Sequence, residues 1–335
     1  MVGGYCPATG PVATTDRPPV ILVTGASGFI GTALLTALRQ GGHCFRPVYR
    51  RDNASDTDAG VVVPAISSTT AWESHLGNVS SIVHLAARVH IMKDAALDPL
   101  SEFREVNVAG TLNLARQAAL HGVKRFVYIS SIKVNGEWTS AGGAFRPDDI
   151  PKPVDPYAIS KLEAESGLRQ IAAETGIEVV IIRPVLVYGP KVKGNFLSMM
   201  KWLYRGIPLP LGSLHNLRSI VAVENLVDLI LTCLRHPAAS NQTFLVSDGH
   251  DLSTPDLLRR TAAAMDRVVR LIPTSPSFLE AGANLLGKRD LAQRICCSLQ
   301  VDISKTRQLL AWHPPLTVNQ GLQNTVDYFL AHQAG

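Results

Sequence analysis

The 335-residue sequence has few cysteines and no long apolar run. Its five cysteines are odd in number, scattered and without a C-x-x-C pair, so neither a disulfide framework nor a zinc site is predicted. Every apolar run is well short of the roughly 20 residues that a membrane-spanning helix needs. We therefore expect a protein with no metal site and no membrane span.

Residues 1–18 lack the basic start and the apolar core of a signal peptide. They are predicted to form a disordered N-terminal extension, and the protein is predicted to be cytoplasmic. Charge is also not concentrated anywhere, because 32 basic and 27 acidic residues give a net charge of +5 without a long basic run. This spread argues against nucleic-acid binding and fits small anionic ligands.

The most informative stretch is 20–31, VILVTGASGFIG, in which an apolar run enters a glycine-rich turn and then a helical pattern. Gly25 permits the tight turn, Gly28 lets the backbone approach a pyrophosphate, and Gly31 lets the helix pack closely on the sheet. The helix predicted over residues 29–40 directs its positive end at that anion. The pattern predicts a dinucleotide-binding unit.

Strand-like and helix-like segments alternate over the first half to two thirds of the chain. This alternation predicts an α/β fold with a Rossmann-like, doubly wound parallel sheet. Beyond Tyr188 the pattern changes, which predicts a smaller C-terminal substrate-binding domain. The expected domains are 19–187 with about 217–250 for the cofactor, and 188–216 with 251–335 for the substrate.

Tyr157 and Lys161 are four residues apart in a predicted helix, so their side chains lie on one face. Asp155 and Pro156 are typical of a helix start, which places Tyr157 in the first turn. A neighbouring ammonium is expected to lower the pKa of Tyr157 and make it usable as an acid and base. Ser131 lies at the C-terminal end of the strand predicted over 125–131, where ligands of such sheets bind. Each feature alone also fits a surface helix or a local cap.

Together these residues resemble the short-chain dehydrogenase/reductase superfamily, in its extended epimerase/dehydratase branch that acts on nucleotide sugars. The resemblance covers about residues 19–250. It is carried by the motifs TGASGFIG (24–31), HLAA (84–87), NVAGT (107–111), YISS (128–131), YAISK (157–161) and RPVLVYGP (183–190).

The resemblance implies that Ser131 binds the reacting oxygen, Tyr157 is the acid and base, and Lys161 lowers the pKa of the tyrosine and holds the nicotinamide ribose. His84 is interpreted as a packed core histidine. Substrate contacts are implied for Arg88, Lys133, Asn195 and Arg218. The cofactor-binding set is Gly25, Ser27, Gly28, Phe29, Ile30, Gly31, Arg50, Arg51, Leu85, Ala86, Ala87, Asn107, Tyr157, Lys161 and Pro184.

The choice of cofactor depends on the end of the second predicted strand, where a carboxylate would hold the ribose diol of NAD. Arg50 and Arg51 stand there instead, and two guanidinium groups can pair with the 2′-phosphate of NADP. NADP(H) is therefore predicted, with NAD as the less favoured cofactor.

Ser131 is followed by Ile132 and Lys133 and not by the Asp-Glu pair that is typical of dehydratases. A closer resemblance is to bacterial 4-ketoreductases of O-antigen (lipopolysaccharide) synthesis. It implies NADPH-dependent reduction of a UDP-linked 4-keto-6-deoxy-N-acetylhexosamine to UDP-N-acetylquinovosamine or UDP-N-acetylfucosamine. A NAD-dependent UDP-sugar 4-epimerase and a non-catalytic NADP-binding regulator remain as alternatives. A homodimer through helices at about 99–121 and 157–175 is also implied.

Overall fold

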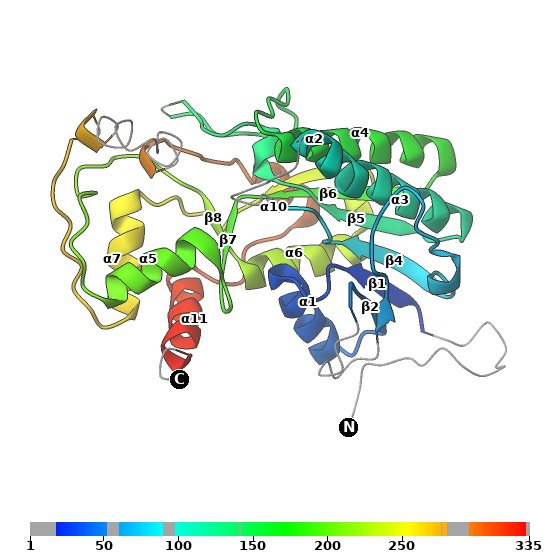
Figure 1. Cartoon of the computed structure of the whole chain (residues 1–335), viewed down its shortest axis with the longest axis horizontal. Helices are drawn as coiled ribbons and strands as arrows, with labels where there is room; N and C mark the ends of the chain where they lie inside the picture. The colour runs from blue at the N-terminus through cyan, green and yellow to red at the C-terminus, as the bar shows by residue number, and fades with distance from the viewer. Residues whose placement is uncertain are drawn as a thin grey trace. The chain divides into compact units, whose positions relative to one another are not determined.

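The structure, a computed structural model, describes residues 18–51, 60–89, 98–140, 142–275, 277–279 and 295–332. The predicted N-terminal extension lies outside these residues except for its last position. The chain divides into two compact units, which are described separately below (Figure 1). The first unit comprises residues 1–134, 151–183 and 230–244, and the second comprises residues 135–150, 184–229 and 245–335.

The first unit is built on a seven-stranded sheet with the strand order β3-β2-β1-β4-β5-β6-β9. Neighbouring strands from β3 to β6 are parallel, and the order reverses direction between β1 and β4, as in doubly wound nucleotide-binding sheets. The α/β, Rossmann-like fold class is therefore confirmed. The strands are β1 (Val20–Thr24), β2 (Phe45–Tyr49), β3 (Val61–Val62), β4 (Val79–His84), β5 (Arg125–Ile129), β6 (Glu178–Pro184) and β9 (Thr243–Val246).

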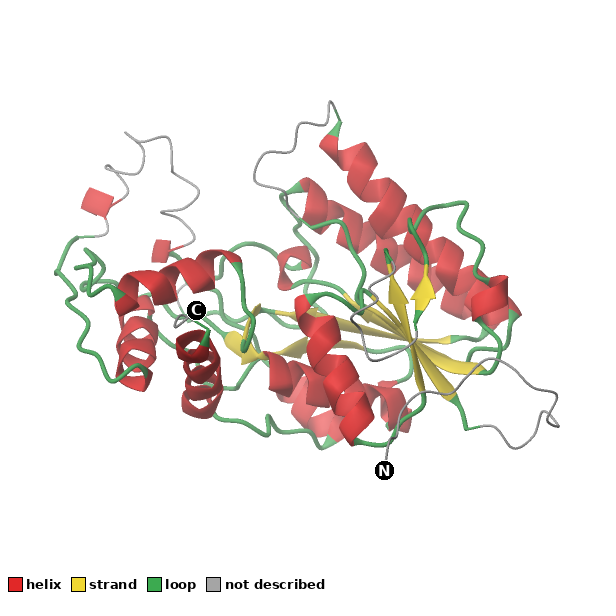
Figure 2. Cartoon of the chain, turned by 60° about the horizontal axis from the view of Figure 1, so that its bottom comes forward, coloured by secondary structure: helices red, strands yellow, loops and turns green. Residues whose placement is uncertain are grey.

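Helices cover both faces of this sheet (Figure 2). Helices α3 (Thr111–Leu120) and α4 (Pro156–Thr175) bury apolar side chains against one face, and α1 (Phe29–Gln40) covers the other. The core between α3, α4 and the sheet includes Leu22, Ile82, Phe126, Leu114 and Leu168, all completely buried. Short 3₁₀ turns lie at Glu73–His75, Ile132–Val134 and Pro237–Ala239.

The helix predicted over residues 99–121 is not one regular helix. It begins as α2 (Pro99–Phe103), widens into a π-helical segment (Arg104–Gly110) and continues as α3. A π-helical turn holds one more residue than the α-helical turn it replaces, and such turns are frequent at functional sites. No turn signal in the sequence marks this change.

The second unit contains a two-stranded parallel sheet of β7 (Leu186–Tyr188) and β8 (Ile220–Ala222). Helix α6 (Val223–Arg235) begins in this unit and ends in the first. No helix in the described part of the chain is long and apolar enough to span a membrane. The second unit also contains the helices α5 (Gly194–Tyr204), α7 (Thr254–Ala264), α10 (Ser304–Leu310) and α11 (Val318–Ala331).

Candidate active site

The turn between β1 and α1 has the geometry of a pyrophosphate cradle. Gly25 has φ +70°, and a Cβ at this position would lie 2.7 Å from the backbone nitrogen of Ala86. A Cβ on Gly31 would lie 2.7 Å from the carbonyl oxygen of Ala26. The N-cap of α1, Gly28, has no side chain to satisfy the first-turn N–H groups. These N–H groups and the close glycine backbone fit the phosphates of a dinucleotide.

Ser27 is exposed in this turn, and Phe29 and Ile30 are half-buried at the start of α1. At the end of the neighbouring strand β2, Arg50 and Arg51 are both exposed. All these predicted cofactor residues lie in the first unit. Their contacts with a cofactor remain predictions.

Leu85, Ala86 and Ala87 follow β4 and are half-buried. The N–H of Leu85 donates to the carbonyl oxygen of Thr24, and the N–H of Ala86 donates to Thr24 Oγ1, both at 3.3 Å. The segment after β4 is therefore hydrogen-bonded to the end of β1, immediately before the glycine turn.

His84 is a completely buried core histidine, as predicted. Its Nδ1 lies 2.8 Å from Thr24 Oγ1, its Nε2 lies 3.0 Å from Thr111 Oγ1, and its ring stacks on Tyr128. Burial, and secondly the charge of Lys161, lowers the pKa of His84 to about 3. The imidazole is therefore neutral at physiological pH.

Ser131 lies two residues after the end of β5, and Tyr157 and Lys161 lie on α4, all in the first unit. Asp155 caps α4 by accepting a hydrogen bond from the N–H of Ala158 at 2.7 Å, and Pro156 is its first residue, as predicted. Tyr157 is therefore in the first turn, with its ring edge-on to Phe103.

Lys161 is almost completely buried and donates from Nζ to the carbonyl oxygen of Ile129 at 2.8 Å. That residue precedes Ser130 and Ser131, so the hydrogen bond ties the lysine to the end of β5. The Nζ atom lies 4.4 Å from the ring centroid of Tyr128 and 6.0 Å from that of Tyr157. The sequence pattern did not indicate that the backbone of β5 would hold this ammonium group.

The expected effect of Lys161 on Tyr157 is not observed. Burial, followed by the nearby carboxylate of Asp155, raises the pKa of Tyr157 above its ordinary value. Burial also lowers the pKa of Lys161 to about 7, and Glu165 acts in the opposite direction. The prediction of a lowered tyrosine pKa was wrong for the protein alone, because it considered the charge of the neighbour and not the desolvation of the phenol.

Asn107 lies in the π-helical segment and is 1% exposed. Its Oδ1 accepts from the N–H of Arg88 at 2.8 Å, and its Nδ2 donates to the carbonyl oxygen of Arg88 at 3.1 Å. Nδ2 also donates to Ser160 Oγ on α4 at 3.0 Å. Asn107 therefore joins its own π-helical segment to the segment after β4 and to α4, near the catalytic candidates.

Two predicted substrate contacts of the first unit already have partners. Lys133 forms an ion pair with Asp155, the cap of α4. Arg88 lies 3.5 Å from Glu102, and its guanidinium stands over the ring of Phe103 at 5.7 Å. Their proposed role toward a substrate remains a prediction.

The other predicted substrate contacts belong to the second unit. Asn195 is exposed near the start of α5, and Arg218 is half-buried, donating from Nη1 to the carbonyl oxygen of Cys297 at 3.1 Å. Pro184 is the buried last residue of β6. Their roles likewise remain predictions.

The sequence did not reveal a buried charged network beside the catalytic candidates. Glu165, one turn after Lys161, accepts a hydrogen bond from Ser130 Oγ at 2.6 Å. It also accepts from Arg183 of β6 at 2.9 Å and 2.6 Å, and from Arg169 at 3.0 Å. The only signal was the arginine in the otherwise apolar and buried strand β6, because Glu165 is one of several charged residues in α4.

Residues 21–247, more than half of the chain, match the model of the NAD dependent epimerase/dehydratase family. The chain belongs to this family. The UDP-glucose 4-epimerase of Vibrio cholerae is 46% identical to this family member over 325 residues, which cover 95% of this chain and 98% of the relative. The predicted family and its nicotinamide-dinucleotide-binding fold are confirmed.

Two solved structures have the same fold as this member of the epimerase/dehydratase family. MoeE5 in complex with UDP-glucose and NAD has a TM-score of 0.73 at 24% identity and covers 93% of this chain and 99% of its own. RMD from Pseudomonas aeruginosa complexed with NADPH has a TM-score of 0.70 at 22% identity and covers 94% and 99%. Both cofactors therefore occur on this fold, and the predicted preference for NADP is not decided by it.

The prediction of a 4-ketoreductase was wrong. The relative that matches nearly the whole chain at 46% identity is named an epimerase, and this agrees with the alternative that the sequence left open. A reductase and an epimerase of this family need the same acid, base and hydride chemistry at carbon 4. They differ in whether the hydride returns to the same sugar, and no side chain in the motifs records that difference.

Proposed function

We propose that the protein is a UDP-sugar 4-epimerase that interconverts UDP-glucose and UDP-galactose. The main support is the 46% identity to a UDP-glucose 4-epimerase over 95% of this chain. The placement of Ser131, Tyr157 and Lys161 at the end of β5 and the start of α4 is consistent with that chemistry.

A bound nicotinamide dinucleotide supplies hydride exchange at carbon 4 of the sugar. In the proposed reaction Tyr157, as the phenolate, takes the proton of the sugar 4-hydroxyl and becomes the phenol, and it later returns this proton to the same oxygen. Ser131 donates a hydrogen bond to that oxygen, and Lys161 in its protonated form places a positive charge beside the tyrosine. Asn107 fixes the backbone of Arg88 and so the shape of the segment after β4.

An epimerase regenerates its cofactor in each turnover, so it does not need a reduced cofactor from outside. This property separates the proposal from any reaction that consumes NADPH. Arg50 and Arg51 still favour a cofactor with a 2′-phosphate, because their guanidinium groups can pair with it. An epimerase can use such a cofactor, since the 2′-phosphate takes no part in hydride transfer. Asn195 and Arg218 are the proposed contacts of the UDP diphosphate.

The test is to incubate the purified protein with UDP-galactose and with UDP-glucose and to follow the anomeric proton signals by NMR. We expect both reactions to reach the same equilibrium mixture without net consumption of cofactor. UDP-N-acetylglucosamine in a parallel sample tests the width of the substrate range. No conversion of any of these sugars in the presence of NAD and NADP would contradict the proposal.

The arrangement in two functional domains and the homodimer also remain proposals. The sugar-binding role is assigned to the second unit because Asn195 and Arg218 lie there. Sedimentation analysis of the purified chain tests the dimer through α2, α3 and α4.

A further inference from the structure

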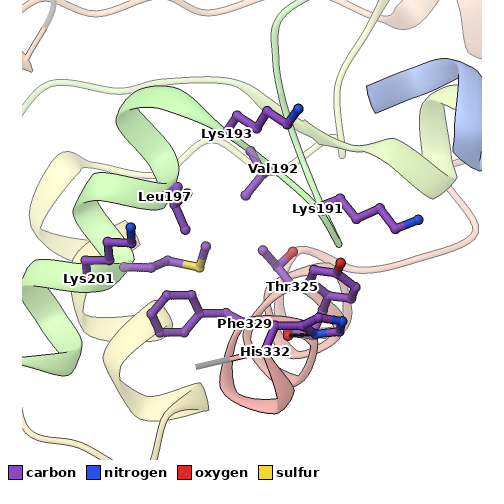
Figure 3. A pocket seen from close by; sticks show the side chains of 11 residues that line it. Lys191, Val192, Lys193, Leu197, Lys201, Thr325, Phe329 and His332 are labelled. Atoms are coloured by element: carbon purple, nitrogen blue, oxygen red, sulfur yellow. Dashed lines mark hydrogen bonds between the residues drawn. The ribbon is translucent and has the colours of Figure 1, made fainter. Parts of the chain in front are cut away.

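The second unit contains a cavity of about 410 Å³ whose walls come from the loop at 189–193, α5 and α11 (Figure 3). This volume is within the roughly 300–1,000 Å³ that small-molecule sites occupy. Its lining includes none of Ser131, Tyr157, Lys161, Asn195 and Arg218. The cavity is therefore not explained by the proposed reaction.

The cavity also faces away from the predicted sugar-nucleotide contact on α5. Leu197, Met200 and Lys201 line it, whereas Asn195 does not. At about 100° per residue, these three side chains lie about 120° or more around the helix from Asn195. The two functions would therefore use different sides of α5.

The charged side chains that line the cavity are all lysines, and Glu224 Oε2 lies behind the wall, 3.6 Å from where a Cβ on Gly189 would be. Lys191, Lys193 and Lys201 contribute to the lining, and no aspartate or glutamate does. Within the described residues, lysine ion pairs are formed by Lys133 and Lys305 and not by these three. The three ammonium groups point in different directions around the cavity (Figure 3). Positive charges on the walls of a concave surface raise its potential and favour an anion.

The loop that carries two of these lysines has a defined backbone shape. Gly189, Lys191 and Gly194 have φ values of 152°, 71° and 65°. A left-handed lysine is uncommon and persists where its surroundings fix the conformation. A Cβ on Gly189 would lie 2.5 Å from Val223 Cγ1, so the loop packs closely on the start of α6.

The remaining walls are apolar and aromatic. Met200 and Phe329 are almost completely buried and form part of the floor. Tyr328 and His332 stack with ring centroids 3.9 Å apart, and His332 Nδ1 donates to the carbonyl oxygen of Tyr328 at 2.8 Å. The ring orientation of His332 is therefore fixed, and a flat ligand ring has an aromatic pair against which it can stack.

We propose that this cavity is a second binding site, for a nucleotide whose phosphate contacts the three lysines and whose base lies against the Tyr328–His332 pair. Lysines act as point charges toward phosphate, and aromatic faces accept bases of any sequence. Such a site goes beyond the proposed epimerase activity and requires no chemical step.

The test is calorimetric titration of the full chain with AMP in the absence of NAD and UDP, because either nucleotide would compete for the proposed site. AMP that binds at the glycine turn of the cofactor site instead is recognised because Lys201→Gln does not change its affinity. We expect saturable binding of one AMP per chain. Lys201→Gln is expected to weaken binding about tenfold, the loss of one charge-assisted contact. Lys124→Gln, which removes an exposed lysine of the first unit, is the matched control and is expected to leave binding unchanged.

Two further titrations separate the parts of the proposed ligand. Adenosine reports the ring alone and inorganic phosphate reports the anion alone, and both are expected to bind at least tenfold more weakly than AMP. Tyr328→Leu is expected to weaken AMP about tenfold and to leave phosphate unchanged. Absence of saturable AMP binding, equal affinity for phosphate and AMP, or AMP binding that is unchanged by Lys201→Gln would overturn the proposal. None of these readouts depends on epimerase activity.

Discussion

Glu165 and Arg183 form an ion pair in which both side chains are almost completely buried. The guanidinium group donates from Nε to Oε1 at 2.9 Å and from Nη2 to Oε2 at 2.6 Å. This two-pronged geometry is the strong form of the arginine–carboxylate interaction. It joins α4, which carries Tyr157 and Lys161, to β6 of the seven-stranded sheet.

Glu165→Gln is expected to lower the free energy of unfolding by about 3–5 kcal/mol, because Arg183 would remain as a buried charge without its counter-charge. Urea denaturation at pH 7 measures this change. The matched control is Glu163→Gln on the same helix, where the partner Arg104 is exposed. Its cost is expected to stay below about 1 kcal/mol. An equal loss of unfolding free energy in the two variants would contradict the argument that burial makes the Glu165–Arg183 pair costly to break.

Tyr157→Phe is expected to lower the rate of sugar interconversion about 10²- to 10⁴-fold, because the phenol is the proposed proton carrier. Binding of NAD or NADP is expected to change little. NMR of UDP-galactose conversion gives the rate, and circular dichroism verifies the fold. Tyr204→Phe, a tyrosine of the second unit that lies edge-on to Phe329, serves as the control. A variant that keeps most of its rate would remove Tyr157 from the mechanism.

Arg50→Ala combined with Arg51→Ala is expected to raise the dissociation constant of NADP about tenfold or more, since each guanidinium can make a charge-assisted contact with the 2′-phosphate. NAD, which lacks that phosphate, is expected to bind within about twofold of its original affinity. Calorimetric titration with both nucleotides measures the difference. Arg116→Ala, an exposed arginine on α3, controls for the loss of surface charge.

The stability of the protein is expected to fall as the pH drops below about 6.5, because of His84. Its pKa is about 3 in the folded protein and about 6.5 in an unfolded chain, so the unfolded state binds one more proton between these values. The slope contributed by this residue is about 1.4 kcal/mol per pH unit at pH 5. Urea denaturation at pH 7, 6 and 5 measures it. In His84→Asn the slope is expected to decrease by this amount, even though the variant is less stable throughout.

Much of the fold of the first unit could be predicted from local signals. Helix α1 runs from Phe29 to Gln40, between Gly28 at its N-cap and Gly41 at its C-cap, as predicted. Helix α4 begins after Asp155, with Pro156 as its first residue, as predicted. The sequence could not reveal the π-helical segment, because no proline or turn motif marks it and its weak helix formers, Val106, Asn107, Val108 and Gly110, also occur in ordinary helices. Periodicity alone is insensitive to one inserted residue.

The candidate site was predictable as a set of residue types but not as an electrostatic environment. Tyr157 and Lys161 are recognisable by spacing, whereas the desolvation that changes both pKa values depends on the folded core. The contact between Glu165 and Arg183 could not be predicted from the sequence. The two residues are 18 positions apart, and one lies on a helix and the other on a strand. Whether the reaction is an epimerisation or a net reduction depends on whether the cofactor stays bound and returns its hydride to the same sugar. No motif encodes this difference.

The widened turn at Arg104–Gly110 also sets the helical phase of everything that follows it. If this segment took up ordinary α-helical winding at its present length, the extra residue would rotate α3 by about 100° relative to α2. Leu114, Ala115 and Ala118 would then turn away from the sheet they now cover. This segment should therefore tolerate substitutions at its exposed positions far better than substitutions of Asn107 that remove the contacts of the wide turn.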